Sequence, residues 1–486
     1  SADLSPHLTQ IVREAERLRT VDIDPDALAP SLRAESVTVE LFDDVRVELR
    51  TTVALSRGAA VGGTVSRVYA AAGEDTAAAV TVIDGDLHGV FWQGATRYGI
   101  EPLGGGRHLV FEDGRTFPDE APPVAARRVD TAAPPTSAPA DVSPLSTTVI
   151  DILVAFDNSA QAEFGSVAAI EDEIVEMVNL ANVVYANSEI DVQLALTDIL
   201  DVDYTPNASD GTTNYQTYLN AIRSKVDGIV DVVHTARDAG GADLVAMISD
   251  LTGACGVGSL PVSTDPAELS AYTLTDGLCA VGNLSFPHEV GHNLCAHHDP
   301  PNAPGNPCDT DAFAHYSAAA GLRTVMAYAN DTNGCVSCTR IPYFSNPDVA
   351  YSGWTTGVLG SRDNARVIRS RAADVAAYRS PGTGGPAPCQ VTYTITATWS
   401  GNVQVSLLVE NLTSTTLNGW TAEWTFTGDE DVYNSWGVTV SQVGPAATAT
   451  GDGYGATVPA LGSVTVGFQA TVTGTPTVPA TVTCDA

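Results

Sequence analysis

Positive charge is scarce in this sequence. Its 486 residues include 23 Lys and Arg against 58 Asp and Glu, and the only lysine is Lys225. The formal net charge is −35 at pH 7. A nucleic-acid-binding protein needs a basic stripe that displaces counterions from phosphates, and this sequence has none. We therefore exclude nucleic acid as a partner, and the acidity favours solubility.

Long apolar runs are missing as well. No run reaches the roughly 18 residues that a membrane-spanning helix requires, so we expect no membrane partner. The composition, 44% hydrophobic and 17% charged, is typical of globular domains rather than disordered chain. The length predicts two to four such domains. The sequence starts at Ser1 rather than at Met, which indicates a leader peptide removed during export.

Cysteine is absent from the first 254 residues. All eight cysteines lie between Cys255 and Cys484, and an even number clustered in this way is typical of disulfides. Disulfides persist outside the cytosol, so we expect a secreted, extracellular protein. Reduced or metal-binding thiols are the alternative. The close pair Cys335 and Cys338 stands outside any thioredoxin-like βαβ pattern, which favours a local disulfide over redox chemistry or a structural metal.

Two stretches rich in Pro, Ala and Gly divide the chain, and we interpret them as linkers. They separate an N-terminal, a central and a C-terminal piece. The resulting division is residues 1–120, linker 121–146, residues 147–379, linker 380–388 and residues 389–486.

Hydrophobic periodicity gives each piece a different character. The N-terminal piece has a helical pattern at residues 8–19 and then alternates like short strands at 36–49 and 78–94, so it is expected to be mainly β. The C-terminal piece alternates almost throughout and predicts an all-β sandwich. The central piece mixes both periods. Its predicted strands are 147–156, 191–199 and 243–249, and its predicted helices are 168–186 and 363–378.

The segment HEVGHNLCAHHD, residues 288–299, carries the strongest chemical signal. His288 and His292 are four residues apart, so on a helix they share one face and can bind one ion. A catalytic zinc site needs three protein ligands and an open position for water, and His298, six residues later, can complete the set. Its neighbour His297 breaks the spacing and is expected to be no ligand. A surface helix with idle histidines is the alternative, but this pattern rarely arises by accident.

Glu289 follows the first of these histidines. Zinc lowers the pKa of a bound water to about 7, and an adjacent carboxylate can accept the proton as that water attacks a carbonyl. Glu289 is therefore the candidate general base.

This region resembles the metzincin zinc metallopeptidases, whose motif H-E-x-x-H-x-x-G-x-x-H is followed by a methionine turn, here TVMAY with Met326. The segments GACGVGSL, CTRIPYFSNPDV and DNARVI are similar to the bacterial reprolysin-like branch that includes peptidyl-Asp metallopeptidases. The resemblance implies an α/β catalytic domain with a mixed sheet and an active-site helix, and Met326 packed beneath the zinc. It also implies that Tyr328 stabilises the oxyanion; a tyrosine packed in the core is the alternative.

The sequence departs from the family motif at one position. Cys295 replaces the glycine at a sharp turn where φ is usually positive, and a residue with a Cβ costs roughly 1–2 kcal/mol there. Either the strain is tolerated, with a bridge to Cys308 that holds the turn, or this loop differs from that of the family. The expected disulfides are Cys255–Cys279, Cys295–Cys308, Cys335–Cys338 and Cys389–Cys484.

The N-terminal piece loosely resembles reprolysin-like prodomains, which implies a zymogen. Because this piece contains no cysteine, it cannot silence the zinc with a thiol, and a carboxylate or a backbone group must replace it. The dibasic pair Arg127–Arg128 is the expected processing point. A permanent accessory β-domain is the alternative.

The C-terminal piece resembles family-2 carbohydrate-binding modules, with cysteines at both ends and several quoted motifs such as LNGWTAEWTF. The resemblance implies that Trp399, Trp436 and Tyr454 stack on sugar rings of insoluble cellulose or chitin, while Trp420 is a core residue. Aromatics that all lie in the core are the alternative. Tyr454 stands where the family usually has Trp.

Together these features predict a secreted zinc endopeptidase, made as a zymogen and directed to polysaccharide by its C-terminal module. Two other functions stay open: an inactive polysaccharide-binding protein, and a zinc amide hydrolase or deacetylase acting on glycans. Substrates are expected to be proteins or peptides, the cofactor one catalytic Zn²⁺, and the protein a monomer. Calcium binding is not readable from the sequence, and cleavage beside Asp is only a property of the family.

Overall fold

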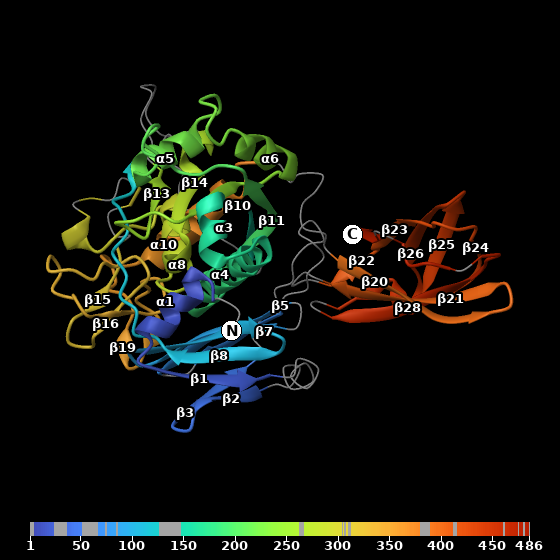
Figure 1. Cartoon of the computed structure of the whole chain (residues 1–486), viewed down its shortest axis with the longest axis horizontal. Coiled ribbons are helices and arrows are strands. Elements are labelled where there is room, and N and C mark those ends of the chain that lie inside the picture. The colour runs from blue at the N-terminus through green and yellow to red at the C-terminus, as the bar shows by residue number, and fades with distance from the viewer. Residues whose placement is uncertain are drawn as a thin grey trace. The chain divides into compact units, whose positions relative to one another are not determined.

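The computed structural model describes residues 4–23, 36–50, 67–72, 75–83, 86–125, 147–261, 267–303, 305, 308–309, 313–379, 389–411, 416–459, 462–474, 476–479 and 482–485 (Figure 1). They form two compact units, one of residues up to 379 and one from residue 389 onward. Among these described residues, no helix combines the length and the apolar composition needed to cross a membrane.

The N-terminal piece is a short helix followed by a large antiparallel sheet. Its strand order is β1-β8-β7-β6-β5-β4-β3-β2, drawn in blue and cyan in Figure 1. The stretches predicted to alternate form the antiparallel pairs β2–β3 and β5–β6. The bounds are α1 Pro6–Glu14, β1 Arg17–Asp22, β2 Ser36–Phe42, β3 Val45–Arg50, β4 Arg67–Ala72, β5 Thr76–Ile83, β6 Asp86–Gln93, β7 Thr96–Gly104 and β8 Arg107–Glu112.

The predicted helix at residues 8–19 is wrong in its second half. Helix α1 ends at Glu14, and Ala15 is already extended, with φ −64° and ψ 135°. Strand β1 then pairs with β8 from Arg17↔Glu112 to Asp22↔Arg107. Pairing with a strand far away in the sequence outweighs the local helix propensity here.

The central piece is built on a mixed sheet with the order β11-β10-β12-β14-β13-β9. Strands β11, β10, β12 and β14 are parallel, whereas β13 is antiparallel to β14. Helix α4 packs against β11 and against α9, the helix of the histidine motif. The bounds are β10 Thr148–Asp157, α3 Asn158–Phe164, α4 Val167–Asn187, β11 Val192–Val202, α5 Tyr215–Arg223, α6 Val232–Gly240, β12 Leu244–Ser249, β13 Gly256–Leu260, α7 Ala267–Ser270, β14 Tyr272–Asp276, α8 Gly277–Ala280, α9 Ser285–Asn293 and α10 Asn364–Val375.

These elements lie where the periodicity predicted them. Strands β10, β11 and β12 are the three predicted strands, and α4 and α10 are the two predicted helices. Between α9 and α10 the described chain has little regular structure. Its elements there are η1 Pro300–Asn302, β15 Tyr316–Ser317, β16 Leu322–Arg323, β17 Thr339–Arg340, β18 Ala350–Tyr351 and β19 Trp354–Thr355.

The start of the first predicted linker is not a linker. Val124–Ala125 form strand β9, which pairs in parallel with Ser259–Leu260 of β13 at the edge of the mixed sheet. The rest of that stretch, residues 126–146 with the dibasic pair, and the second linker, 380–388, lie outside the described residues.

Four disulfides join the pairs expected from the sequence. They are Cys255–Cys279, Cys295–Cys308, Cys335–Cys338 and Cys389–Cys484. Three lie in the central piece and brace the poorly regular segments around α9. The fourth joins the two ends of the C-terminal unit.

The C-terminal unit is a β-sandwich. Its two four-stranded sheets have the orders β20-β21-β28-β24 and β25-β26-β23-β29, and a small pair β22-β27 completes it. Trp420, Trp424 and Phe468 fill the core between them. The bounds are β20 Cys389–Trp399, β21 Asn402–Asn411, β22 Leu417–Asn418, β23 Thr421–Thr425, β24 Asp431–Trp436, β25 Val438–Val443, β26 Ala446–Gly451, η2 Gly453–Gly455, β27 Thr457–Val458, β28 Ser463–Thr471 and β29 Val482–Asp485.

Candidate active site

Three histidine side chains converge beside helix α9. His288 and His292 lie one turn apart on α9, and His298 returns to them from the loop that follows the helix. The Nε2 atom of His298 is 3.1 Å from that of His288 and 3.0 Å from that of His292. All three rings are buried.

The other ring nitrogens fix the tautomers of two of these histidines. Nδ1 of His288 faces the Val325 carbonyl at 2.9 Å, and Nδ1 of His292 faces the Ala296 carbonyl at 2.9 Å. A carbonyl only accepts hydrogen bonds, so each Nδ1 carries the proton and each Nε2 presents a lone pair. Burial lowers the pKa of His288 to about 4, which keeps the ring neutral.

Converging lone pairs repel one another unless a cation lies between them. Tetrahedral zinc with Zn–N bonds of about 2.0–2.1 Å would space its nitrogens by about 3.3 Å, close to the spacing observed. The three histidines therefore fit a zinc ion with one face left for water or substrate.

The chain reaches His298 through a turn with left-handed backbone at Cys295, where φ is 67°. The Cys295 amide bonds to the His292 carbonyl and the Ala296 amide to the Gly291 carbonyl, the Schellman pattern that usually ends on glycine. The turn of the family motif is thus kept despite the Cβ, and the disulfide to Cys308 anchors it.

The neighbours of His298 take other roles. His297 accepts a hydrogen bond from the His298 amide at Nδ1, and it is not among the three converging ligands. Asp299 accepts hydrogen bonds from the Tyr328 amide and from Asn333. It therefore ties the methionine turn to the histidine loop.

Met326 lies under the helix that carries the histidines. A Cβ built on Gly291 would lie 2.9 Å from Met326 Sδ and 3.0 Å from the Phe344 ring. Only glycine at that position lets the methionine turn pack so closely, which agrees with the packing role expected for Met326.

Glu289 points from α9 toward strand β13. It is fully buried, and neither carboxylate oxygen has a hydrogen-bond partner among the described residues. A Cβ on Gly256 or on Gly258 would lie 2.6–3.0 Å from the side-chain oxygens of Glu289, so these glycines make its space. Burial and the Glu120 carboxylate raise the pKa of Glu289, as suits a group that takes up a proton.

Tyr328 lies over the histidine cluster. Its ring centroid is 4.1 Å from that of His298, and its hydroxyl donates to the Glu120 backbone carbonyl at 2.7 Å. The phenol thus already binds a peptide carbonyl beside the three histidines, which is the contact needed of an oxyanion donor.

The segment from Asp119 to Ala125 lies between β13 and the residues that follow the methionine turn. The Ala121 amide bonds to the Gly256 carbonyl at 2.8 Å, and β9 continues the pairing with β13. On the opposite side, Asp119 accepts from the Ala329 amide at 2.9 Å. The segment is therefore held on both sides, and its Glu120 lies beside His288 and Tyr328 of the candidate site.

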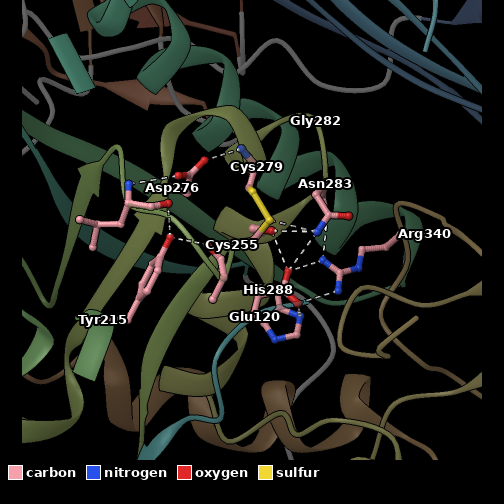
Figure 2. The surroundings of a disulfide bond; sticks show 12 residues. Glu120, Tyr215, Cys255, Asp276, Cys279, Gly282, Asn283, His288 and Arg340 are labelled. Carbon is pink, nitrogen blue, oxygen red and sulfur yellow. Dashed lines mark hydrogen bonds and ion pairs between the residues drawn. A yellow bond between two sulfur atoms is a disulfide. The ribbon is translucent and has the colours of Figure 1, made fainter. Parts of the chain in front are cut away.

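Glu120 inserts its side chain into a buried basic pocket beside the first histidine (Figure 2). Both of its oxygens are paired with the Arg340 guanidinium, through Nη1 and, at 2.8 Å, through Nη2. Ser285 donates to it at 2.7 Å, and its Oε2 lies 3.7 Å from Nδ1 of His288. Burial raises the pKa of this carboxyl, but the charge and hydrogen bonds of Arg340 outweigh it and leave the pKa low.

Arg340 has a second arginine beside it. Strands β16 and β17 pair Arg323 with Arg340, and both side chains are buried. Arg323 donates to the carbonyls of Cys338 and Ala327, while Arg340 also donates to the Asn283 carbonyl. Figure 2 shows Asn283 and the Cys255–Cys279 disulfide bordering the same pocket.

Sequence reasoning missed this pocket. Arg340 lies in CTRIPYFSNPDV, which the sequence marked only as a family resemblance, and Glu120 is the last residue before the predicted linker. Pairing of residues so far apart in the chain leaves no local pattern. The one available signal was the scarcity of positive charge, which makes an arginine within an apolar stretch unusual.

Of the aromatic residues expected to bind sugar, Trp399 and Trp436 lie on one sheet of the C-terminal unit, and Tyr454 lies in η2. Trp399 is 43% exposed and Tyr454 61% exposed, whereas Trp436 is half-buried against Gly467. By register, Trp399 and Trp436 both lie on the outer face of the sheet β20-β21-β28-β24. Tyr454 donates to the Thr465 carbonyl of β28.

A polar ladder crosses the same face. Gln469 donates to Gln404 at 3.0 Å and accepts from Asn434 at 3.2 Å. Trp420, in contrast, is fully buried and donates to the Gly455 carbonyl at 2.7 Å. The structure thus separates the core tryptophan from Trp399 and Trp436 of the outer face and from the exposed Tyr454.

Two protein families match this chain. Residues 146–345 match Reprolysin_5, metallo-peptidase family M12, and residues 389–486 match the cellulose binding domain CBM_2.

Individual relatives agree with both matches. The chain is 31% identical over 309 residues to a peptidyl-Asp metalloendopeptidase of Xanthomonas campestris pv. campestris, covering 62% of this chain and 70% of the relative. It is 33% identical over 239 residues to one of Stenotrophomonas maltophilia, covering 47% of this chain and 52% of that protein. Endoglucanase A of Thermobispora bispora is 32% identical over 98 residues, 20% of this chain and 21% of that enzyme.

Three converging imidazoles, an adjacent buried glutamate and these matches lead to one assignment. The chain belongs to metallo-peptidase family M12 and is a zinc metalloendopeptidase that carries a cellulose-binding domain.

Proposed function

We propose that this protein is exported as an inactive precursor, cleaves peptide bonds next to an acidic side chain, and is held near polysaccharide by its C-terminal unit. The observation that carries the proposal is the Glu120 carboxylate seated on Arg340, beside the zinc-ligating His288. Two curated relatives are named peptidyl-Asp metalloendopeptidases, and an acidic side chain is what this pocket accepts.

The electrostatics of the pocket support a preference for acids. Arg340 and Arg323 are buried guanidinium groups, and Glu120 is the carboxylate between Arg340 and the histidines. When Glu120 leaves, Arg340 loses its anionic partner in a desolvated place, which is strongly unfavourable. A substrate carboxylate restores the pair, whereas a neutral side chain does not, and pockets built to hydrogen-bond a polar group discriminate by large factors.

Zinc, when bound by His288, His292 and His298, would polarise the scissile carbonyl and activate water. The chain's own groups transfer the proton, stabilise the oxyanion and hold the substrate. Glu289 takes the proton from the attacking water and passes it toward the leaving amine. Tyr328 donates to the carbonyl oxygen, as it does to the Glu120 carbonyl now. Strand β13 holds the substrate backbone by the hydrogen bonds that β9 uses here.

The precursor is inactive because its own segment occupies the substrate site. The segment Asp119–Ala125 is tethered to the peptidase, so it competes with substrate at the high effective concentration of an intramolecular ligand. Cutting within 126–146 alone leaves Glu120 attached to the N-terminal sheet, which must then dissociate. Export is supported by the four disulfides.

The test is a comparison of intact chains on a quenched peptide that contains Asp. Glu120→Gln keeps the shape of the side chain but removes the charge, so the uncut variant should hydrolyse the peptide at least about tenfold faster than the uncut parent. Glu16→Gln, at an exposed glutamate of the same piece, is the control and should stay latent. Full activity in the uncut parent would mean that the N-terminal piece is an accessory domain.

A polysaccharide-targeting role is supported by a separate observation. The outer face with Trp399 and Trp436, together with the exposed Tyr454, offers aromatic rings along a sheet with a neutral amide ladder between them. Flat apolar sugar faces stack on such rings, and neutral glycans need no opposing charge.

A further inference from the structure

A second group of histidines and carboxylates lies far along the chain from the zinc ligands. It joins the N-terminal sheet to the peptidase, and we call its five members, His7, His88, Glu101, Glu173 and Glu176, the His/Glu cluster. His7 comes from the first turn of α1, His88 and Glu101 from the neighbouring strands β6 and β7, and both remaining glutamates from α4.

The cluster contains two sets of three possible metal ligands that share Glu101. His7, Glu101 and Glu173 form one set and His88, Glu101 and Glu176 the other, with the ligand atoms of each set within 4.8 Å of one another. Oε1 of Glu101 is 3.8 Å from Nε2 of His7, and its Oε2 is 3.7 Å from Nδ1 of His88. One carboxylate therefore faces both histidines.

Several polar atoms of the cluster are buried and have no hydrogen-bond partner among the described residues. His7 and His88 are only 6% and 4% exposed, and none of their four ring nitrogens has a hydrogen bond among the described residues. Oε2 of Glu176 also has none, although it lies 3.4 Å from Nδ1 of His88. Buried polar groups are normally hydrogen-bonded, so five such atoms in one place need an explanation.

Carboxylates outnumber imidazoles in the cluster. Three carboxylates lie in a desolvated space with two imidazoles. Arg115, which acts on Glu173, is already paired with Asp113 at 2.8 Å. Buried charges are stable when they are paired or bind a metal.

We propose that the His/Glu cluster is a second metal site, which binds a divalent transition metal such as zinc between the N-terminal sheet and helix α4. Imidazole and carboxylate are ligands for such ions, with metal–ligand bonds of about 2.0–2.2 Å. Ligands of one ion are then about 3 Å apart, so the three histidine–carboxylate distances given above close by less than about 1 Å on binding, and no distance within a set closes by more than about 2 Å. Since Glu101 is shared, the cluster has room for one or two ions.

The site serves a purpose separate from catalysis. Its ligands come from both sides of the contact between α4 and the N-terminal sheet, so a bound ion fastens the two together. A ligand that binds only the assembled state stabilises that state by mass action. Removing the metal should therefore loosen the N-terminal piece without touching His288, His292 or His298.

The experiment uses the full chain carrying Glu289→Ala, which prevents self-cleavage and keeps the three catalytic ligands. The chain is saturated with Zn²⁺, passed through a desalting column, and its zinc is counted by mass spectrometry. We expect two or three zinc ions per chain. A single zinc ion per chain would overturn the proposal. The negative charge of the carboxylates would then be balanced by bound protons instead of a metal ion.

Variants locate the additional zinc. Adding His7→Gln and His88→Gln should return the count to one, while the matched control His234→Gln, at another buried histidine bonded to Tyr272, should leave it unchanged. Retention of the extra zinc in the double variant would also overturn the proposal. Because truncating buried ligands can prevent folding, hydrogen exchange of the unsubstituted chain provides a second readout. A weak chelator that leaves one zinc should speed amide exchange in α1, β6 and β7, and unchanged exchange would contradict the fastening role.

Discussion

At the scale of single residues, the site depends on small side chains that let large ones approach. Gly291 admits Met326, and Gly256 and Gly258 admit Glu289. The sequence predicted the three histidines, the glutamate and the methionine because their spacing reflects one helix and one turn. It could not predict that glycines of a separate strand enclose the glutamate, since that contact depends on how β13 meets α9.

Replacement of the buried glutamate tests its role as proton acceptor. Glu289→Ala should reduce kcat/KM on a peptide substrate by at least about 10²-fold, since general bases typically contribute 10²–10⁴-fold. Zinc bound at the three histidines should remain, because the ligands are intact. His298→Ala should instead lower zinc occupancy of that site. Peptidase activity and metal content are measured on the same samples. An active Glu289→Ala enzyme would show that another group is the general base.

Arg340 is the residue that should set the preference for acidic side chains. Arg340→Lys keeps the charge but loses the two parallel hydrogen bonds that the guanidinium makes with a carboxylate. In the processed enzyme, kcat/KM for a peptide with Asp should fall by about 10–100-fold, while that for the matching Asn peptide should change far less. Equal losses on both peptides would show that Arg340 only supports the fold.

At the scale of elements, the sequence predicted the long and regular pieces best. Strands β10, β11 and β12 and helices α4 and α10 are long enough for their periodicity to be visible in the sequence. Strand β9 was missed because it has two residues after two prolines, and its partner β13 is more than a hundred residues away. The end of α1 was missed for a similar reason, since β1 is defined by pairing with β8.

The segment around β9 should inhibit as a free peptide. A synthetic FPDEAPPVA, residues 117–125, presents the same carboxylate and the same strand, so it should inhibit the processed peptidase competitively. The peptide with Gln in place of Glu120 should bind about tenfold or more weakly, because it cannot form the ion pair with Arg340. Inhibition constants from initial rates give the comparison. Equal inhibition by both peptides would mean that only the backbone contacts matter.

At the scale of the whole molecule, composition and linkers predicted three pieces, whereas the described residues form two compact units, the first of which contains both the N-terminal and the central piece. The family resemblances predicted what the central and C-terminal pieces are. The predicted disulfide pairs are those of the structure. The contact between the N-terminal sheet and the peptidase was not predictable, because it is made by scattered residues such as Trp92, whose indole donates to the Arg340 carbonyl at 2.9 Å.

Removing the C-terminal unit tests polysaccharide targeting. A chain that ends before residue 384 should hydrolyse a soluble peptide after processing as the full protein does, yet lose adsorption to cellulose or chitin. Trp399→Ala with Trp436→Ala should have the same effect, as each stacked ring contributes about 1–3 kcal/mol by analogy with base stacking. The matched control is Tyr433→Ala, an exposed aromatic outside the three. Adsorption of the double variant in pull-down assays with both polymers would assign binding to another face.

The hydrogen bond from Trp92 to Arg340 gives the molecule an internal optical reporter. Trp92 is fully buried, and it is one of only six tryptophans in the chain. If the N-terminal sheet departs, this indole passes from a dry contact to water, and its fluorescence should shift to longer wavelength. Arg340 cannot bind an acidic peptide while the N-terminal piece occupies it. Each of the two therefore lowers the binding affinity of the other by the same factor. The emission of Trp92 would therefore record activation in real time, before any product is released.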